Sequence, residues 1–210
     1  LNITFISLHI ACNRVPMESS SAVTHDLTLE SVKEEIYSRN NPTLTPIDIE
    51  AHASTVHRIL ELKKKHDVVI LGHNYMEPLV FGISEQNEQG DSLALSMSAV
   101  QTDSQYIIFN GVRFMAETAK ILNPEKTVLI PDPLAGCSLA SSITGADVRM
   151  LKQRYPGVPV VSYVNTSADV KAETDVCCTS GNAVQVVESL GTERVIFLPD
   201  AYLGRYVERQ

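Results

Sequence analysis

His73 and Tyr75 stand two residues apart, directly after the apolar run 68–71. If that run is a strand, side chains at positions i and i+2 beyond its end can both point into a crevice. An imidazole titrates near neutral pH and a phenol donates hydrogen bonds, so the pair has the chemistry to move substrate protons. A histidine that caps a strand through a backbone hydrogen bond explains the pattern equally well, and the residues alone leave both interpretations open.

Polar side chains at three other turns suit an anion. Asp91 and Ser92 precede a helical run, where exposed N–H groups and a hydroxyl bind phosphate or carboxylate, although a plain N-cap is the simpler interpretation of that stretch. Ser180 lies in a second turn of this kind, and Tyr163 and Asn165 repeat the i, i+2 spacing after another apolar run. Together these residues predict a cradle for a small anionic substrate.

The chain has four cysteines, at positions 12, 137, 177 and 178. They fit no disulfide framework, which favours a reducing compartment and a cytoplasmic protein. Cys177 and Cys178 are adjacent, so they cannot easily direct both sulfurs at one metal, and the chain has no C-x-x-C spacing of a zinc site. Cys137 lies among small residues, where a lone cysteine is most often a buried hydrophobe. An iron–sulfur cluster would need further thiolates brought from elsewhere in space.

Short β-branched runs and helical segments alternate along the chain and must position these residues. Runs bounded by Gly, Pro, Asp or Asn are predicted to be buried parallel strands, at 68–71, 106–109, 127–130, 158–164 and 195–198. Helical periodicity covers 49–65, 92–100, 114–122, 146–155 and 183–189, and another helix starts at 203–207. Such alternation predicts an α/β fold of βαβ units with parallel sheets. Ligands of open parallel sheets bind beyond the carboxyl ends of the strands, where the polar residues above lie.

The similar strand ends divide most of the chain into two repeated lobes. We expect a first αβα lobe at 46–135 and a second at 136–210, incomplete because its last helix is only beginning. Residues 1–45 are rich in Ser, Asn and Pro and are predicted to be a poorly ordered tail with one helix at 29–37. Because the sequence opens with Leu1 and Met17 begins a polar stretch, we hypothesise that the natural start is Met17.

Composition limits the classes of partner. The 210 residues are 44% hydrophobic and 20% charged, as in ordinary globular proteins, and the net charge is -8 with pI ≈ 5.2. No broad basic surface is expected, so a nucleic-acid partner is not predicted. No apolar run reaches the roughly 20 residues that cross a bilayer, so no membrane partner is predicted either. A small-molecule partner is the better expectation.

A series of motifs in order resembles one known family, the A-type iron–sulfur quinolinate synthases. The resemblance covers about residues 50–210 and is far more specific than any single motif. Its motifs are VILGHNY at 69–75, GDSL at 90–93, GVRFMAE at 111–117, ILNPEK at 121–126, AGC at 135–137, YVN at 163–165, CTSGNA at 178–183, LPD at 198–200 and LGRYV at 203–207.

The resemblance implies a fold and a reaction. Three αβα lobes with pseudo-threefold symmetry surround a central cavity, and each lobe gives one Cys to a [4Fe-4S] cluster whose fourth iron stays open as a Lewis acid. The reaction condenses iminoaspartate with dihydroxyacetone phosphate to give quinolinate in de novo NAD biosynthesis. Functional coupling to L-aspartate oxidase is also implied.

Roles for individual residues follow from the same resemblance. His73 and Tyr75 would be catalytic, handling substrate protons and hydroxyls, and Cys137 would be the first-lobe ligand of the cluster. The remaining site residues would bind substrate. Ser92, with Asp91 beside it, and Ser180 would hold phosphate or carboxylate oxygens. Tyr163 and Asn165 would orient the acid groups.

The sequence departs from the family in one large respect. The further ligand cysteines of the family have no counterpart, since Cys177 and Cys178 fall too early in the chain. One thiolate cannot hold a cluster, so we expect a fragment that lacks the C-terminal lobe and is inactive by itself. The alternative is a non-catalytic remnant that binds at most a small anion. A metal-dependent hydrolase built on His73 and Asp91 ranks last, because no second His lies near them.

Overall fold

A computed structural model describes residues 28–39 and 44–210, and their contacts group them into two compact units. The first unit contains residues 28–39, 44–111 and 122–131, and the second unit contains residues 112–121 and 132–210. The predicted tail and the proposed start at Met17 fall largely outside the described residues, although the helix expected at 29–37 is present as α1, Leu29–Arg39.

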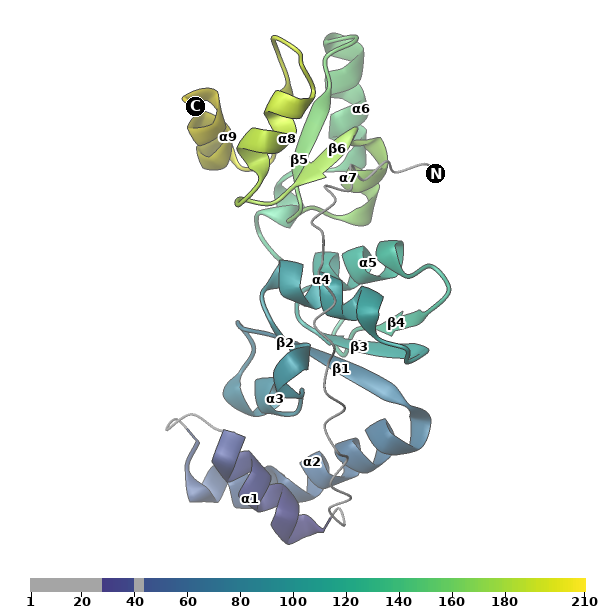
Figure 1. Cartoon of the computed structure of the whole chain (residues 1–210), viewed down its shortest axis with the longest axis vertical. Coiled ribbons are helices and arrows are strands. Elements are labelled where there is room, and N and C mark those ends of the chain that lie inside the picture. The colour runs from purple at the N-terminus through teal and green to yellow at the C-terminus, as the bar shows by residue number, and fades with distance from the viewer. Residues whose placement is uncertain (1–27, 40–43) are drawn as a thin grey trace. The chain divides into compact units, whose positions relative to one another are not determined.

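The first unit is a four-stranded parallel sheet with helices (Figure 1). Its elements are α1, α2 (Pro46–His66), β1 (Val68–His73), α3 (Pro78–Gly82), η1 (Gln86–Glu88), β2 (Gln89–Gly90), α4 (Ser92–Gln101), β3 (Tyr106–Asn110) and β4 (Thr127–Leu129). The strand order is β2-β1-β3-β4, and every pairing is parallel. Strand β1 is therefore interior and is buried along nearly its whole length.

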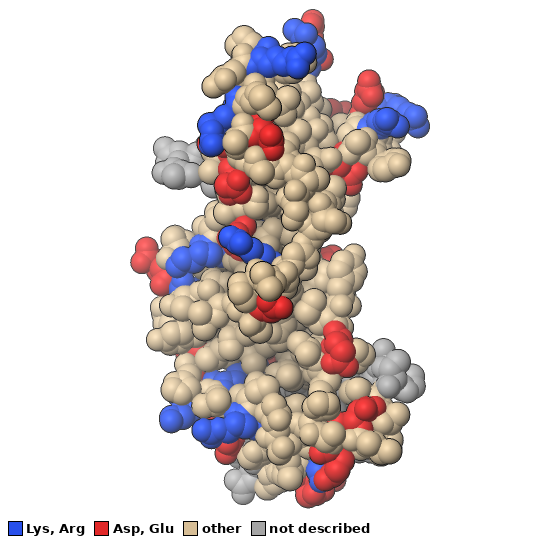
Figure 2. Space-filling view, turned by 180° about the vertical axis from the view of Figure 1, so that it is seen from behind, with Lys and Arg blue, Asp and Glu red and all other residues tan. Residues whose placement is uncertain are grey.

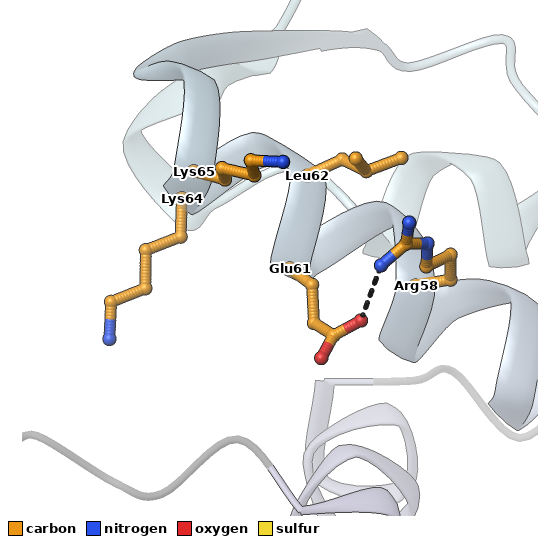
Figure 3. A pocket seen from close by; sticks show the side chains of 5 residues that line it. All are labelled: Arg58, Glu61, Leu62, Lys64 and Lys65. Atoms are coloured by element: carbon orange, nitrogen blue, oxygen red, sulfur yellow. Dashed lines mark hydrogen bonds and ion pairs between the residues drawn. The ribbon is translucent and has the colours of Figure 1, made fainter.

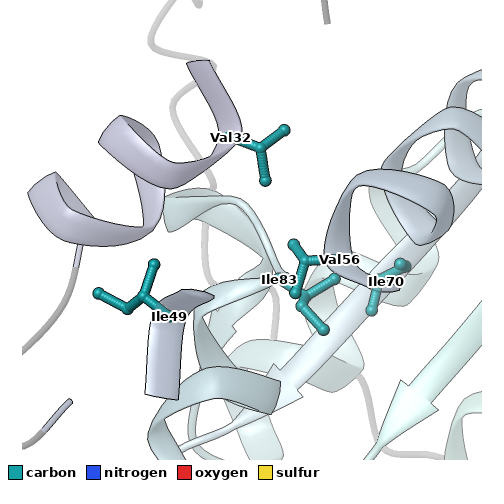
Figure 4. Close-up of a cluster of buried hydrophobic side chains, with 5 residues drawn as sticks. All are labelled: Val32, Ile49, Val56, Ile70 and Ile83. Atoms are coloured by element: carbon teal, nitrogen blue, oxygen red, sulfur yellow. The ribbon is translucent and has the colours of Figure 1, made fainter. Parts of the chain in front are cut away.

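Helix α2 is delimited by its own sequence. Thr45 and Asp48 form a capping box, and Pro46 at the first helical position has no N–H to leave unpaired. The chain then leaves the helix through Asp67, which has a φ of 50°. Side chains from α1, α2, β1 and the end of α3 meet in one apolar cluster, drawn in Figure 4: Val32, Ile49, Val56, Ile70 and Ile83. This cluster anchors α2, and so the start of β1.

The second unit has helices on both faces of a three-stranded parallel sheet. Its elements are α5 (Arg113–Leu122), η2 (Ala140–Ser142), α6 (Gly145–Arg154), β5 (Val160–Tyr163), α7 (Ala168–Glu173), β6 (Val176–Cys178), α8 (Ala183–Ser189), β7 (Ile196–Leu198) and α9 (Ala201–Glu208). The order is β6-β5-β7. Successive residues of β5 enter different clusters, Val160 with α6 and α7, and Val161 with α8 and α9. The predicted α/β class with short parallel sheets is confirmed.

Helices α6 and α7 approach closely at Gly145. A Cβ at this position would lie 2.7 Å from the backbone oxygen of Asp169, closer than a side chain tolerates. The Gly145 N–H instead donates to Asp169 Oδ2 at 2.9 Å. The missing side chain therefore lets the start of α7 lie against the start of α6, which fixes the helix that follows the β5 loop.

Candidate functional site

His73 is the last residue of β1 and is 3% exposed, whereas Tyr75 is 85% exposed. The two rings meet edge to face, with centroids 4.5 Å apart and an interplanar angle of 75°. The Tyr75 N–H donates to His73 Nδ1 at 3.2 Å, so a neutral imidazole carries its proton on Nε2. Both sequence interpretations therefore describe part of the geometry: the histidine accepts a backbone hydrogen bond, and a phenol lies beside it.

The surroundings of His73 favour the neutral imidazole. Burial lowers the pKa of His73 below its usual 6.5, and the negative charge of Asp91 opposes this shift. Asp91 lies near His73 because β1 and β2 are parallel neighbours, and His73 pairs with Gly90, the residue before Asp91. A neutral imidazole at pH 7 can accept a proton, as a general base must.

A pH-dependent loss of stability should follow from this burial. The folded protein holds His73 neutral while the unfolded chain binds a proton below about pH 6.5. The contribution of His73 is complete above that pH and is lost as the pH falls toward the lower folded-state pKa. Urea unfolding followed by circular dichroism from pH 8 to pH 5 should therefore show a falling midpoint. The variant His73→Gln should flatten this slope, whereas the exposed His66→Gln should keep it; equal slopes in all three proteins would contradict the assignment.

Asp91 acts as the N-cap of α4. Its Oδ1 accepts the backbone N–H of Ala94 at 2.9 Å, and its backbone oxygen accepts that of Leu95 at 3.0 Å. The simpler interpretation of this stretch is thus present in the structure. Ser92 follows as the first helical residue and is half-buried. The structure brings Asp91 close to His73 from the neighbouring strand, and the predicted binding roles of Asp91 and Ser92 remain predictions.

In the second unit, three predicted residues follow neighbouring parallel strands. Tyr163 ends β5 and pairs with Cys178, which ends β6, and the Val164 N–H extends the pairing by donating to the Cys178 oxygen at 2.8 Å. Asn165 lies two residues beyond β5 and Ser180 two residues beyond β6. Tyr163 and Asn165 are half-buried and Ser180 is exposed. These three residues therefore share the carboxyl edge of one sheet, where ligands of parallel sheets bind.

The side-chain oxygen of Asn165 is buried and accepts no hydrogen bond from any described residue. A buried acceptor without a partner costs about 1–3 kcal/mol. Such a cost is ordinarily offset by a water molecule or a ligand that supplies the missing group. Asn165 is consequently the residue of this edge whose chemistry points most directly to a bound molecule.

Cys137 lies in the loop that leads to η2 and is half-buried. Its backbone oxygen accepts the Ser141 N–H at 2.9 Å, which shapes a single helical turn beside the thiol. Burial raises the pKa of both other described thiols, that of Cys178 to about 12 and that of Cys177 against the opposing charge of Lys171. Since metal ligation needs the thiolate, burial makes Cys177 and Cys178 poor candidate ligands. Within residues 28–39 and 44–210, no group of three or more His, Cys, Asp or Glu side chains could hold a metal ion.

Sequence reasoning missed two charged residues at the edge that carries Tyr163 and Asn165. Lys171 is 2% exposed, and its ammonium donates to the backbone oxygen of Val164 at 2.8 Å. Glu117 accepts the N–H of Ala168, the first residue of α7, at 2.7 Å. The stretch around Lys171 alternates polar and small residues and has the pattern of a solvated helix, so only its position next to a strand-end loop could have drawn attention.

Two surface pockets contain none of the predicted site residues. One lies along α2 in the first unit, where the Arg58 guanidinium and the Glu61 carboxylate are 3.1 Å apart and neutralise each other (Figure 3). The other lies in the second unit and includes Val195, Ile196 and Phe197 of the β7 region. On the face drawn in Figure 2, basic and acidic side chains are interspersed within each unit. The strand ends therefore remain the candidate site.

Short parallel sheets make this chain an α/β protein, and its polar side chains lie beyond the carboxyl ends of the strands, the usual position of ligand sites in that class. Residues 57–210 match the family model of the quinolinate synthetase A protein, and the chain belongs to this family. Among the residues that the structure describes, no helix combines the length and the apolar character of a membrane span.

Curated relatives carry the same family name. Quinolinate synthase 2 of Mesorhizobium japonicum is 57% identical over 175 residues, which are 83% of this chain and 54% of that protein. The quinolinate synthase of Caulobacter vibrioides is 54% identical over 187 residues, covering 87% of this chain and 50% of that protein. The quinolinate synthase of Agrobacterium fabrum is 60% identical over 156 residues, which are 74% of this chain and 45% of that protein. The chain spans about half the length of the curated relatives it matches.

Proposed function

We propose that this chain contributes to a quinolinate synthase, which condenses iminoaspartate with dihydroxyacetone phosphate to quinolinate in the cytoplasmic biosynthesis of NAD. The family match over residues 57–210 is the observation that carries the proposal. The residues that the resemblance assigns to substrate fall beyond strand ends or at a helix start, as expected of a small-molecule site in an α/β protein. L-Aspartate oxidase is the proposed functional partner, as the source of iminoaspartate.

In the first unit, we assign proton handling to His73 and Tyr75. Burial favours the neutral imidazole, and its ring orientation is fixed by the Tyr75 N–H and by edge-to-face contact with the phenol ring. Because Tyr75 is largely exposed, its hydroxyl can meet a substrate without displacing protein groups. Ser92 and Asp91 stand at the start of α4, whose N–H groups favour a phosphate or carboxylate oxygen.

In the second unit, we assign substrate orientation to Tyr163, Asn165 and Ser180. Both substrates carry anionic groups, and hydroxyl and amide donors bind carboxylate and phosphate without adding charge. The side-chain oxygen of Asn165 has no partner among the described residues, so a hydroxyl or N–H group of a substrate can donate to it, while the amide N–H₂ remains the donor for an anionic oxygen. The Ser180 hydroxyl is exposed beyond the neighbouring strand.

A [4Fe-4S] cluster fits these residues only in part. Cys137 is half-buried and would supply one thiolate, but the described residues contain no group of ligands able to hold a metal ion by itself. A cluster requires several thiolates, which the described residues do not bring together. Cys137 is therefore proposed as one ligand of a cluster that other cysteines complete. The 210 residues alone are proposed to be inactive.

The proposal can be tested on the complete native protein purified under anaerobic conditions. Quinolinate should form from iminoaspartate and dihydroxyacetone phosphate, and iron analysis should find iron together with visible absorption. The 210-residue chain alone should show neither after reconstitution with iron and sulfide. A native protein that stays colourless after reconstitution and makes no quinolinate would instead support the non-catalytic remnant.

A further inference from the structure

The ammonium group of Lys171 is buried with the backbone of one loop as its main partner. Lys171 is 2% exposed, and its Nζ donates to the backbone oxygens of Val164 and Thr166. A third contact, to Thr166 Oγ1, is long at 3.5 Å. Burying a cation without a paired carboxylate is costly, so the partners of this group must be held in place for it to be tolerated.

The loop that Lys171 holds carries Asn165 and directly follows Tyr163, the two proposed substrate residues of this strand end. Residues 164–167 connect the end of β5 to α7. The Thr166 N–H donates to the Val164 oxygen at 2.8 Å, and the Thr166 hydroxyl donates to the Tyr163 oxygen at 3.1 Å. Each backbone oxygen on either side of Asn165 therefore accepts a hydrogen bond from Lys171, so the backbone around this side chain has little freedom.

Helix α5 contacts Lys171 itself and the first residue of α7, which follows the loop. The Phe114 ring centroid is 5.6 Å from Lys171 Nζ, within the range of a cation–π contact. Glu117 binds the Ala168 N–H through Oε2 and the Arg113 Nε through Oε1, at 2.7 and 2.9 Å. The backbone N–H of Arg113 donates to the Ala135 oxygen at 2.8 Å, two residues before the cysteine proposed as the cluster ligand. Helix α5 thus contacts both α7, which begins directly after the loop 164–167, and the loop of the proposed ligand.

We propose that Lys171 is a positioning residue, whose buried ammonium holds the backbone of residues 164–166 so that Tyr163 and Asn165 meet the substrate in a fixed conformation. The inference rests on the proposed function for the identity of that substrate. Lys171 itself does not touch substrate, because its Nζ is enclosed and its donors point at the loop. Glu117 and Cys177 are the charged or titratable groups that act on it, and burial nevertheless lowers the pKa of Lys171 to about 8.

The test compares Lys171→Met with Lys152→Met in the complete native protein. Lys152 lies in α6 of the same unit, and its Nζ makes a partly exposed ion pair with Asp175 at 2.9 Å. Backbone amide hydrogen exchange of residues 164–168 should become at least tenfold faster in Lys171→Met and stay unchanged in Lys152→Met. The KM for substrate should rise about tenfold in Lys171→Met, with a smaller change in kcat, because orientation of the bound substrate is lost.

The milder variant Thr166→Val keeps the lysine and removes the hydroxyl that binds the Tyr163 oxygen. Amide hydrogen exchange of residues 164–168 should also become faster in this variant, but by less. If Lys171→Met does not fold, Thr166→Val replaces it in the test. Exchange that is unchanged, or that rises evenly across the whole second unit with an unchanged KM, would overturn the inference. A native protein that makes no quinolinate counts against the proposed function only, and amide exchange then decides the role of Lys171.

Discussion

Replacing Cys137 with Ala should leave the complete native protein without bound iron and lower quinolinate formation at least a hundredfold. Cys137 is the described thiol that is neither in a strand nor in an apolar cluster. Removal of a thiolate ligand cannot be compensated by a neighbour, because no group of ligands able to hold a metal lies among the described residues. Iron content, visible absorption and quinolinate formation measure the effect.

Cys177→Ala is the matched control for this substitution. Cys177 lies in β6, burial raises its pKa, and its neighbour Cys178 packs in the cluster under α8. Iron content and activity should therefore stay close to those of the native protein. If Cys177→Ala removes the iron and Cys137→Ala keeps it, the ligand assignment is reversed.

Replacing His73 with Ala should lower kcat about a hundredfold, since a positioned general acid or base contributes roughly 10²–10⁴-fold. Tyr75→Phe keeps the ring that meets the imidazole edge to face and removes only the hydroxyl, so we expect a smaller loss, about tenfold in kcat/KM. Steady-state kinetics of quinolinate formation measure both effects. The exposed His66→Ala is the control, and it should leave kcat unchanged. A kcat for His73→Ala within twofold of the native value would remove His73 from catalysis.

The strands that the sequence reveals are the ones made of β-branched residues between turn formers. The runs predicted at 68–71, 106–109, 127–130, 158–164 and 195–198 all overlap an observed strand. Apolar side chains of β1, β3, β5 and β7 enter the cores of the two units. The predicted burial is wrong for the run 127–130, because β4 has no buried residue and Leu129 is exposed. Helix limits also follow from local chemistry, as at Thr144, which begins α6 with a capping box.

Two strands were not predicted, and each has a physical reason. Strand β2 has two residues, Gln89 and Gly90, which have no apolar character and form a strand only because β1 offers a free edge beside them. Strand β6 is Val176–Cys178, too short to show an alternating pattern. Both depend on pairing with distant residues, which local sequence does not encode.

The residue types of the candidate site were predictable, but the buried contacts that hold those residues in place were not. The polar residues beyond the strands could be found because turns and apolar runs are local signals. The burial of Lys171 could not be predicted, since its neighbours along α7 resemble those of a surface helix. The unpaired oxygen of Asn165 also depends on side-chain packing that no spacing reveals. The division at 135/136, the pseudo-threefold arrangement and the individual site roles remain proposals.

The three-stranded sheet places its earliest strand in the middle, with β5 between β6 and β7. One side of β5 finds its partner early, when residues 176–178 emerge, but the other must wait for residues 196–198. During synthesis on the ribosome, the amides and carbonyls on that waiting side of β5 are a template to which another nascent chain can add. The interval between the synthesis of β6 and that of β7 is therefore one in which an edge of β5 that is interior in the finished sheet stays open to pairing with another chain.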